Sequence, residues 1–256
     1  MEDRIALVTG AAGGIGAATA GALARQGARV AALDAATEQL DTEVAKLRAE
    51  GLDVTAFPTD VAAPGRVEST VAAVERLLGP VDLLVNAAGV LRTGTAVELG
   101  DEDWYATLAV NTLGVVHVCR AVVKRMIPRR RGSVVTVASN AAFVPRQGMA
   151  AYSASKAAAT AYTKCLALEV ARYGIRCNVV APGSTDTAML RGMWTDESGP
   201  SATLDGDAGA YRVGIPLRKI ATPAEIADAV SFLLSDRAGH ITMHHLTVDG
   251  GAALGV

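Results

Sequence analysis

The chain has 256 residues, half of them hydrophobic, and its 24 basic and 26 acidic residues give a net charge of −2 at pH 7. This length suits one large α/β domain with a sizeable core, and the apolar composition excludes a disordered chain. The near balance of charge argues against a nucleic-acid-binding protein or a polybasic membrane-surface protein. Aromatic residues make up only 4% of the chain, which has 26 glycines. We therefore expect closely packed backbones.

Nothing in the sequence approaches the roughly 18 uninterrupted apolar residues of a membrane span. A strand-like segment begins at Ile5, so we expect no signal peptide and no membrane partner. The three cysteines, Cys119, Cys165 and Cys177, are odd in number and lack Cys-x-x-Cys spacing. We expect reduced, mostly buried thiols in a cytoplasmic protein.

Short β-branched runs alternate with longer helical stretches along the whole chain. Strands are predicted at Ile5–Thr9, Arg29–Asp34, Asp53–Pro58, Leu83–Asn86, Ser133–Ala138, Arg176–Ala181 and Leu246–Asp249. Helices are predicted at Gly16–Gln26, Glu38–Glu50, Pro64–Leu78, Asp103–Met126, Tyr152–Tyr173 and Pro223–Leu234. The alternation predicts one α/β domain with a Rossmann-like, doubly wound parallel sheet of about seven strands, flanked by helices on both faces.

One region departs from this alternation. From about Asp186 to Ile215 the sequence is rich in Gly, Ser, Thr and Asp. A structureless stretch of this length inside a compact domain is usually functional, so we expect a substrate lid. A disordered surface excursion is the alternative.

A glycine-rich loop, Gly10-Ala11-Ala12-Gly13-Gly14-Ile15-Gly16, joins the first strand to the first helix. Glycines there permit a tight turn and close approach of the backbone to a phosphate, which the N-terminus of the helix would then face. The spacing is G-x-x-x-G-x-G, which differs from the commoner G-x-G-x-x-G. Because the loop lies between a strand and a helix, we predict a dinucleotide site.

Asp34 ends the second strand. A carboxylate at this position accepts hydrogen bonds from both ribose hydroxyls of the adenosine half and repels a 2′-phosphate. Ala35, Ala36 and Thr37 follow, so no arginine is at hand to receive such a phosphate. The predicted cofactor is NAD rather than NADP. A strand-end aspartate that only caps a turn is the alternative.

Two further loops follow predicted strands, at Asp60-Val61 and at Asn86-Ala87-Ala88-Gly89. Open α/β sheets bind ligands at the carboxyl ends of their strands. Each loop alone resembles an ordinary turn, but their shared edge predicts that they contact the cofactor.

Ser139 follows a predicted strand, and Tyr152 and Lys156 lie four residues apart on one helix face. A tyrosine acts as a base only as phenolate, which ordinarily requires a pH near 10. A nearby ammonium and the positive nicotinamide ring favour the phenolate. Ser139 can hold the substrate oxygen by a hydrogen bond. This trio is the predicted catalytic centre.

Taken together, these motifs closely resemble the NAD-dependent short-chain dehydrogenase/reductase family over essentially the whole chain. The resemblance implies that Tyr152 is the acid/base, Lys156 orients the nicotinamide ribose, Ser139 positions the substrate and Asn111 anchors a water in a proton relay. It also implies a homotetramer. The implied cofactor-binding residues are Gly10, Gly14, Ile15, Gly16, Asp34, Asp60, Val61, Asn86, Ala87, Gly89, Tyr152, Lys156, Pro182, Gly183, Thr185 and Thr187.

Within that family, the segments AAGVLRTG, VASNAAFVPRQGMAAYSASKAA, RCNVVAPGSTDTAM, GIPLRKIA and HITMHHLTVDGGAALGV resemble the 2,3-dihydro-2,3-dihydroxybenzoate dehydrogenases. That subfamily oxidises a ring hydroxyl of a cyclohexadiene carboxylate on the route to siderophore catechols. Arg146 lies between Ser139 and Tyr152, and its guanidinium can grip a carboxylate bidentately. The resemblance adds Leu91, Gly148 and Met189 to the expected substrate pocket. Arg92 and Arg191 are weaker carboxylate candidates.

Several alternatives remain open. An amine in place of the C2 hydroxyl would make the substrate a 2,3-dihydro-3-hydroxyanthranilate. A 3-hydroxyacyl or steroid dehydrogenase is more distant, and Arg146 argues against a neutral steroid. A non-catalytic dinucleotide-sensing regulator could share the fold, although the complete catalytic set argues against it. His244 and His245 should point in different directions on a strand, so we expect no metal site.

Overall fold

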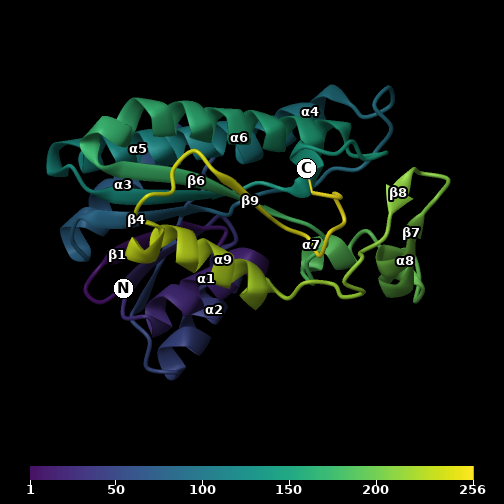
Figure 1. Ribbon diagram of the computed structural model, residues 1–256. Helices are drawn as coiled ribbons and strands as arrows, with labels where there is room; N and C mark the ends of the chain where they lie inside the picture. Colours follow the sequence, from purple (N-terminus) through teal and green to yellow (C-terminus); the bar gives the residue numbers. More distant parts are fainter. Residues whose placement is uncertain (256) are drawn as a thin grey trace.

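The computed structural model describes residues 1–255. Seven parallel strands form one twisted sheet in the order β3-β2-β1-β4-β5-β6-β9 (Figure 1). Their bounds are β1 (Ile5–Thr9), β2 (Arg29–Asp34), β3 (Val54–Pro58), β4 (Val81–Asn86), β5 (Gly132–Val137), β6 (Ile175–Pro182) and β9 (His245–Val248). The chain reverses its winding direction between β1 and β4, where doubly wound sheets open a crevice for ligands. The predicted α/β fold is confirmed.

Helices cover both faces of the sheet (Figure 1). Ile5 and Leu7 of β1 belong to one apolar cluster, which includes α3 (Pro64–Leu77), α5 (Val115–Arg129) and α6 (Ala150–Val170). Ala6 and Val8 belong to the other, which includes α1 (Gly14–Arg25), α2 (Thr37–Ala49) and α9 (Pro223–Leu234). Successive residues of a strand point to opposite faces, so a continuous apolar run fills both layers.

Helix α9 begins and ends where the sequence predicts, and its start carries a complete capping box. The Thr222 hydroxyl accepts a hydrogen bond from the Glu225 backbone N–H at 3.3 Å, and the Glu225 carboxylate accepts one from the Thr222 N–H at 2.8 Å. Pro223 occupies the first turn, where no donor is needed.

The single helix predicted over Asp103–Met126 is wrong in one respect. The structure has α4 (Asp101–Leu108), then a π-helical turn (Ala109–Gly114), then α5. A π-turn holds one extra residue and often occurs at functional sites. Hydrophobic spacing cannot reveal it, because the stretch stays helical and apolar throughout.

The helical stretch Asp101–Arg129 is also long and apolar enough, by length and composition alone, to cross a membrane. Half of its most apolar window is buried inside the protein, however, and Val118, Cys119 and Val122 belong to the core. Core helices of folded domains meet the same criteria of length and composition. Their burial identifies these residues as part of a core helix.

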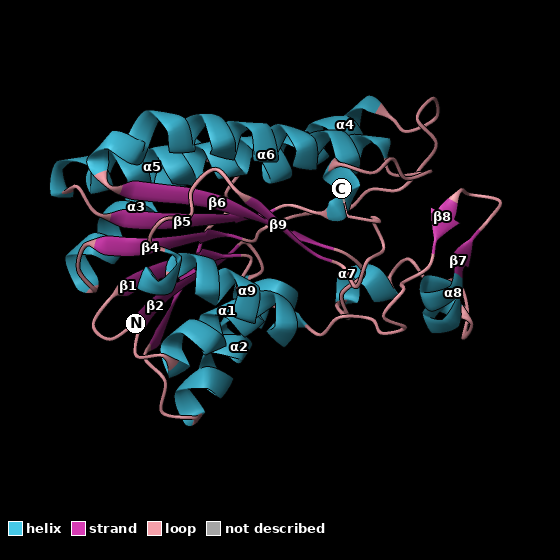
Figure 2. Cartoon of the chain, in the orientation of Figure 1, coloured by secondary structure: helices cyan, strands magenta, loops and turns pink. Residues whose placement is uncertain are grey.

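The region from 186 to 215 is not structureless, contrary to expectation. It contains α7 (Ala188–Arg191), α8 (Gly199–Asp205) and a small antiparallel hairpin of β7 (Gly206–Asp207) and β8 (Arg212–Val213), which project beyond the sheet (Figure 2). The Trp194 indole donates a hydrogen bond to the Thr203 hydroxyl at 3.2 Å. A Cβ at Gly199 would lie 2.2 Å from the Trp194 ring, so the indole packs directly on α8. We call residues 186–215 the lid segment; its role as a lid stays a prediction.

One smaller expectation is wrong. The rings of His244 and His245 do not diverge but stack at 5.9 Å between centroids, because β9 begins only at His245. The three cysteines are free, and Cys119 and Cys177 are buried whereas Cys165 is exposed, in agreement with the expectation of mostly buried thiols. Within residues 1–255, no group of three His, Cys, Asp or Glu side chains could hold a metal ion.

Candidate active site

The glycine-rich loop packs tightly at the carboxyl end of β1. Gly10 adopts a left-handed conformation with φ +72°, and a Cβ there would lie 2.7 Å from the Ala88 backbone nitrogen. A Cβ at Gly16 would lie 2.0 Å from the Gly10 carbonyl oxygen. Neither position therefore admits a side chain. The loop brings the N-terminus of α1, with its free N–H groups, to the crevice between β1 and β4.

The Asp34 carboxylate joins two backbone segments at the end of β2. It accepts hydrogen bonds from the Ala12 N–H at 3.1 Å and from the Ala36 N–H at 3.0 Å. The turn-capping alternative is thus part of its role. Each carboxylate oxygen has a second lone pair, so the same group can also accept hydrogen bonds from a ribose.

The loop after β4 is bonded to β1. The Thr9 hydroxyl accepts hydrogen bonds from the Ala87 N–H at 3.0 Å and the Ala88 N–H at 3.1 Å. Asn86 donates to the Cys119 sulfur at 3.2 Å, and its amide oxygen is buried without a hydrogen-bond partner in the described part of the chain. These contacts fix the backbone that faces the glycine-rich loop.

The loop after β3 lies at the same edge of the sheet. The Asp60 carboxylate accepts a hydrogen bond from the Ala62 N–H at 2.9 Å and is exposed. Val61 is buried, and its carbonyl lies 3.0 Å from His117 Nδ1. Together with Asp34 they border the position expected for the adenosine half of a dinucleotide.

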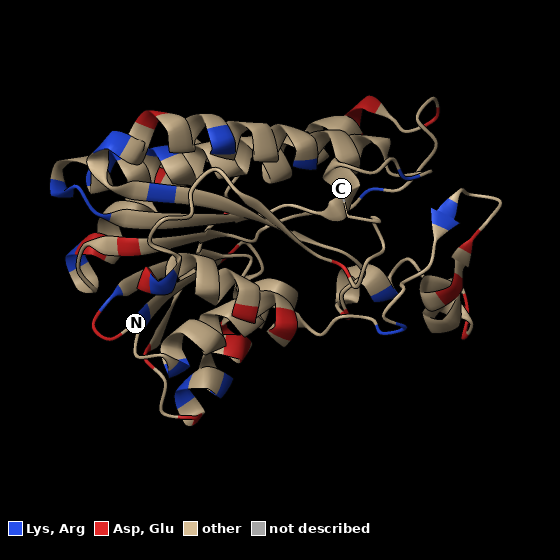
Figure 3. Ribbon diagram, viewed as in Figure 1, with Lys and Arg blue, Asp and Glu red and all other residues tan. Residues whose placement is uncertain are grey.

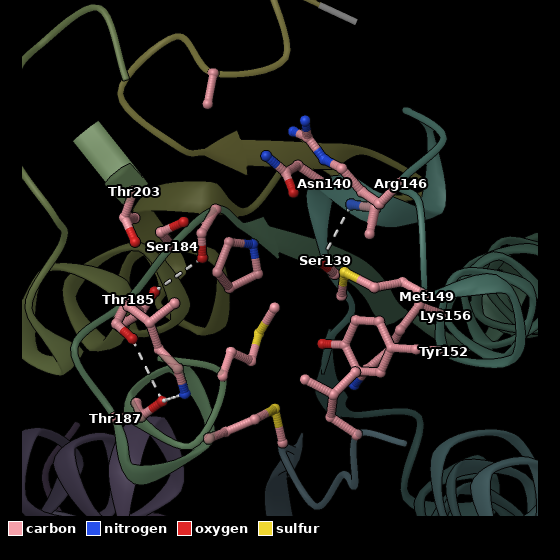
Figure 4. Close-up of a pocket in the computed structure, with 18 of the residues that line it drawn as sticks. Ser139, Asn140, Arg146, Met149, Tyr152, Lys156, Ser184, Thr185, Thr187 and Thr203 are labelled. Atoms are coloured by element: carbon pink, nitrogen blue, oxygen red, sulfur yellow. Dashed lines mark hydrogen bonds between the residues drawn. The ribbon is translucent and has the colours of Figure 1, made fainter. Parts of the chain in front are cut away.

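Ser139, Tyr152 and Lys156 converge on one cavity (Figure 4). Ser139 follows β5, and the other two lie in the first turns of α6. The Lys156 ammonium donates a hydrogen bond to the Val137 carbonyl at 3.0 Å and lies 5.7 Å from the centroid of the Tyr152 ring. All three side chains are buried.

Burial dominates the electrostatics of this trio. It raises the pKa of Tyr152 above its ordinary value, against the hydrogen bond from Ser139, which lowers it. It also lowers the pKa of Lys156 from 10.5 to about 8. Removal from water disfavours the charged form of each group. The expected phenolate therefore depends on a further positive charge, which the oxidised nicotinamide ring expected from the sequence would supply.

Asn111 lies in the π-helical turn, and hydrogen bonds to backbone and side chain hold its amide. Its oxygen accepts a hydrogen bond from the Val90 N–H at 2.8 Å, and its nitrogen donates to the Val90 carbonyl at 2.9 Å and to the Ser155 hydroxyl at 3.0 Å. The amide thus joins the loop after β4 to α6. Its expected role in a water relay stays a prediction.

The cavity has a volume of about 310 Å³. Nine of the expected cofactor residues line it: Ile15, Ala87, Gly89, Tyr152, Lys156, Pro182, Gly183, Thr185 and Thr187. The others lie outside its lining, in the loops at the same edge: Gly10, Gly14, Gly16, Asp34, Asp60, Val61 and Asn86. A Cβ at Gly14 would lie 3.1 Å from the Thr187 methyl, which shows how closely the glycine-rich loop approaches the loop after β6.

The expected substrate residues divide into two groups. Leu91, Arg146 and Met189 line the cavity, whereas Gly148 does not. Neither of the weaker arginine candidates lines it. Arg191 pairs with both carboxylate oxygens of Asp186, at 2.7 and 2.9 Å, and Arg92 forms an exposed ion pair with Asp103 at 3.4 Å.

The structure adds lining residues that sequence reasoning missed. The thioethers of Met149 and Met193 join that of Met189, and Thr203, Asp207 and Arg212 reach the cavity from the lid segment. The charge of Arg212 is visible in the sequence. Its position is not, because it depends on a short hairpin within a region that the sequence predicts to be irregular.

These loops fit a dinucleotide. Glycines clear the approach to the N-terminus of α1, a carboxylate lies at the end of β2, and the unpartnered amide oxygen of Asn86 lies beside the crevice. The fit rests on the close backbone packing at Gly10 and Gly16, where no side chain has room, and on the open space beside Gly13, where a Cβ would meet no atom within 4 Å.

Comparisons with known proteins agree with this geometry. The family model described as short chain dehydrogenase matches residues 4–198. A 2,3-dihydro-2,3-dihydroxybenzoate dehydrogenase of Bacillus subtilis (strain 168) is 54% identical over 100% of this chain and 98% of its own length. One of Escherichia coli (strain K12) is 45% identical over 97% and 96%.

Among solved structures, a gluconate 5-dehydrogenase from Burkholderia cenocepacia J2315, in complex with NADP and tartrate, has a TM-score of 0.91. It is 31% identical, and the match covers 100% of this chain and 97% of that one. The family model covers most of the chain. Both relatives named above are dehydrogenases, and the matches cover 98% and 96% of their own lengths. The chain is therefore an oxidoreductase that belongs to the short-chain dehydrogenase family.

Proposed function

We propose that this chain is an NAD-dependent 2,3-dihydro-2,3-dihydroxybenzoate dehydrogenase that forms 2,3-dihydroxybenzoate, a siderophore catechol acid. The observation that carries the proposal is that Arg146 lines the same cavity as Ser139, Tyr152 and Lys156. A group that binds carboxylate thus lies beside a dehydrogenase centre. The names of the relatives in Bacillus subtilis and Escherichia coli support the same substrate.

The residues divide the work of oxidation at the ring C3 hydroxyl. NAD, when bound, accepts the hydride from C3. Ser139 holds the hydroxyl oxygen, and the Tyr152 phenolate removes the hydroxyl proton, so that the C3 carbon becomes a ketone. Movement of the C2 proton to this oxygen then gives the aromatic catechol, which makes the overall step strongly favourable.

Lys156 acts through its charge. Its ammonium faces the Tyr152 ring and lies beside Gly89, where a Cβ would be 3.2 Å from Nζ. Lys156 would thus hold the nicotinamide ribose of a bound cofactor, and the positive ring of the oxidised cofactor would lower the pKa that burial raises in Tyr152. Turnover is therefore expected to rise with pH as the tyrosine ionises.

The proposed preference for NAD rests on Asp34. Its carboxylate is held at the end of β2 by two backbone N–H groups, and no basic residue occurs in Ala35-Ala36-Thr37. Steady-state kinetics with both cofactors test this: kcat/KM is expected to be clearly higher with NAD. A higher value with NADP would refute the assignment.

One incubation series tests the reaction. The protein is mixed with NAD and either 2,3-dihydro-2,3-dihydroxybenzoate or 2,3-dihydro-3-hydroxyanthranilate, and NADH absorbance and product fluorescence are followed. Turnover of the diol acid supports the proposal, and preferential turnover of the amino acid analogue would favour the amine-bearing substrate. Turnover of neither ring acid would reject the proposed function.

We further propose that the enzyme acts in the cytoplasm as a homotetramer. Large apolar side chains are exposed on the helices and near the C-terminus, among them Leu113, Leu168 and Leu254. Burial of such side chains between subunits would remove them from water. Light scattering coupled to size-exclusion chromatography tests this, and a monomer at micromolar concentration would contradict it.

A further inference from the structure

The cavity contains a second arginine that the catalytic mechanism does not use. Arg212 belongs to β8 of the hairpin in the lid segment, which Figure 3 shows as a basic strand beyond the edge of the sheet. Arg146 belongs to the loop between β5 and α6. Both line the cavity that also holds Tyr152. Two segments that lie far apart in the sequence, the loop after β5 and the hairpin of the lid segment, therefore place positive charge at the same cavity.

The two guanidinium groups influence one another electrostatically. Burial is the main reason that the pKa of Arg146 lies below its ordinary value, and the positive charge of Arg212 is the second. Like charges that face one cavity repel each other. An anion bound between the two guanidinium groups would attract both of them. This attraction would outweigh their repulsion and draw the two segments together.

Among residues 1–255, no carboxylate lies within ion-pair distance of either arginine. The Arg212 Nη2 donates to the Ala202 carbonyl of α8 at 3.1 Å, and its Nε–H is buried without an acceptor. The hydrogen-bonding capacity of Arg212 is therefore only partly used.

Two carboxylates near the arginines are held by other groups. Asp207 accepts hydrogen bonds from the Gly209 and Ala210 N–H groups at 2.9 and 3.3 Å. Asp249, whose charge raises the pKa of Arg146, accepts one from the Asn140 amide at 3.1 Å and one from the Gly251 N–H at 2.9 Å. Both carboxylates thus already accept hydrogen bonds from groups other than the two arginines.

We propose that Arg212 is a specificity-determining residue that binds the substrate carboxylate from the lid segment, opposite Arg146 on the body of the domain. The proposal rests on the proposed function in one respect, namely that the substrate is a carboxylic acid. The carboxylate bridges the two guanidinium groups, so binding of the acid itself closes the hairpin over the ring. A neutral ring of the same shape leaves the two positive charges unbridged.

The chain offers a matched control. Arg218 also lies near the hairpin and also donates to a carbonyl of α8, that of Leu204, at 3.2 Å, but it pairs with Asp205 at 2.7 Å and does not line the cavity. Arg212→Gln and Arg218→Gln therefore remove comparable contacts to α8. Only the first removes charge from the cavity.

The test measures binding of two aromatic ligands that differ only in the carboxylate, 2,3-dihydroxybenzoate and catechol, by calorimetry in the presence of NAD. Loss of a hydrogen-bonded charge pair corresponds to about 10- to 100-fold in affinity. Arg212→Gln should weaken binding of the acid by that factor and leave the affinity for catechol unchanged, and Arg146→Ala should have the same effect on both ligands. Arg212→Lys should restore part of the loss, and Arg218→Gln should match the wild type for both ligands.

Closure of the lid segment has its own readout. Trp194 packs on α8 and is one of two tryptophans, so in a Trp104→Phe background its emission reports on this segment. Addition of the acid should change the emission in the wild type and in Arg218→Gln but not in Arg212→Gln. Unchanged affinity for the acid in Arg212→Gln, or an equal loss for catechol, would overturn the proposal.

Its failure is distinguishable from failure of the proposed function. If the wild type does not oxidise the dihydrodiol acid yet binds the aromatic acid through Arg212, the carboxylate site stands and the proposed reaction fails. If it oxidises the acid and Arg212→Gln keeps the same KM and affinity, the reaction stands and the site fails. If the wild type neither oxidises the dihydrodiol acid nor binds the aromatic carboxylate, both fail.

Discussion

Lys156 should make the protein less stable than it would be without a charge at this position. Burial lowers its pKa from 10.5 to about 8. Each tenfold change in proton affinity is worth about 1.36 kcal/mol, so the buried ammonium costs the folded state roughly 3 kcal/mol near neutral pH. Replacing it in Lys156→Met removes this cost but leaves the Val137 carbonyl without its donor, which offsets about 1 kcal/mol. The expected net gain is about 2 kcal/mol.

The pH dependence gives the sharper test. Below about pH 8 the lysine is charged in both the folded and the unfolded protein, so the wild type bears the full penalty there. Between pH 8 and 10.5 the folded protein releases its proton first, and the penalty fades. The advantage of Lys156→Met is therefore full at pH 7 and smaller at pH 9.5.

Thermal unfolding without NAD, at one protein concentration, measures both quantities. At pH 7 the melting temperature of Lys156→Met should exceed that of the wild type by about 4 to 8 °C, although turnover is lost. Lys46→Met is the control: Lys46 is exposed and pairs with Glu43 on the surface of α2, so its replacement should change stability by no more than about 0.5 kcal/mol. A destabilised Lys156→Met at pH 7, or an advantage that persists undiminished at pH 9.5, would refute the reasoning.

Three other substitutions test separate parts of the structure. Tyr152→Phe should reduce kcat by about 10²- to 10⁴-fold with unchanged affinity for NAD by fluorescence titration; retained turnover would remove the acid/base role. Gly16→Ala places a methyl group 2.0 Å from the Gly10 carbonyl oxygen, so it should weaken NAD binding and lower the free energy of unfolding in urea by about 1–3 kcal/mol. A variant with normal NAD affinity and normal stability would contradict the tight packing. Thr222→Ala removes the capping box of α9 and should cost about 1 kcal/mol in the same assay without affecting KM; no loss of stability would show that the cap contributes nothing.

The sequence predicts the central sheet well, for a physical reason. β1, β2 and α9 begin and end at the predicted residues, because apolar runs buried on both faces and a complete capping box are local signals. The loops at the carboxyl ends of the strands are also predictable, since parallel topology gathers them at one edge.

What the sequence did not predict depends on contacts between distant segments. The hairpin at β7 and β8 is only four paired residues, and its position relative to the cavity depends on α8 and on the packing of Trp194 against Gly199. Arg212 therefore remained outside every prediction. From the sequence, nearby positive charges are expected to favour the Tyr152 phenolate. The sequence does not show how deeply the ring is buried, and this burial raises the pKa of Tyr152.

The π-helical turn at Ala109–Gly114 fixes the rotational phase of the helix that precedes it. One extra residue in a turn rotates everything on one side of it by about 100° relative to a continuous α-helix. The face that α4 presents to α6 thus depends on a single inserted residue. Deleting one residue from this turn would mainly rotate α4 about its axis. The rotation would expose the buried Thr107 and break the hydrogen bonds between Asn111 and Val90.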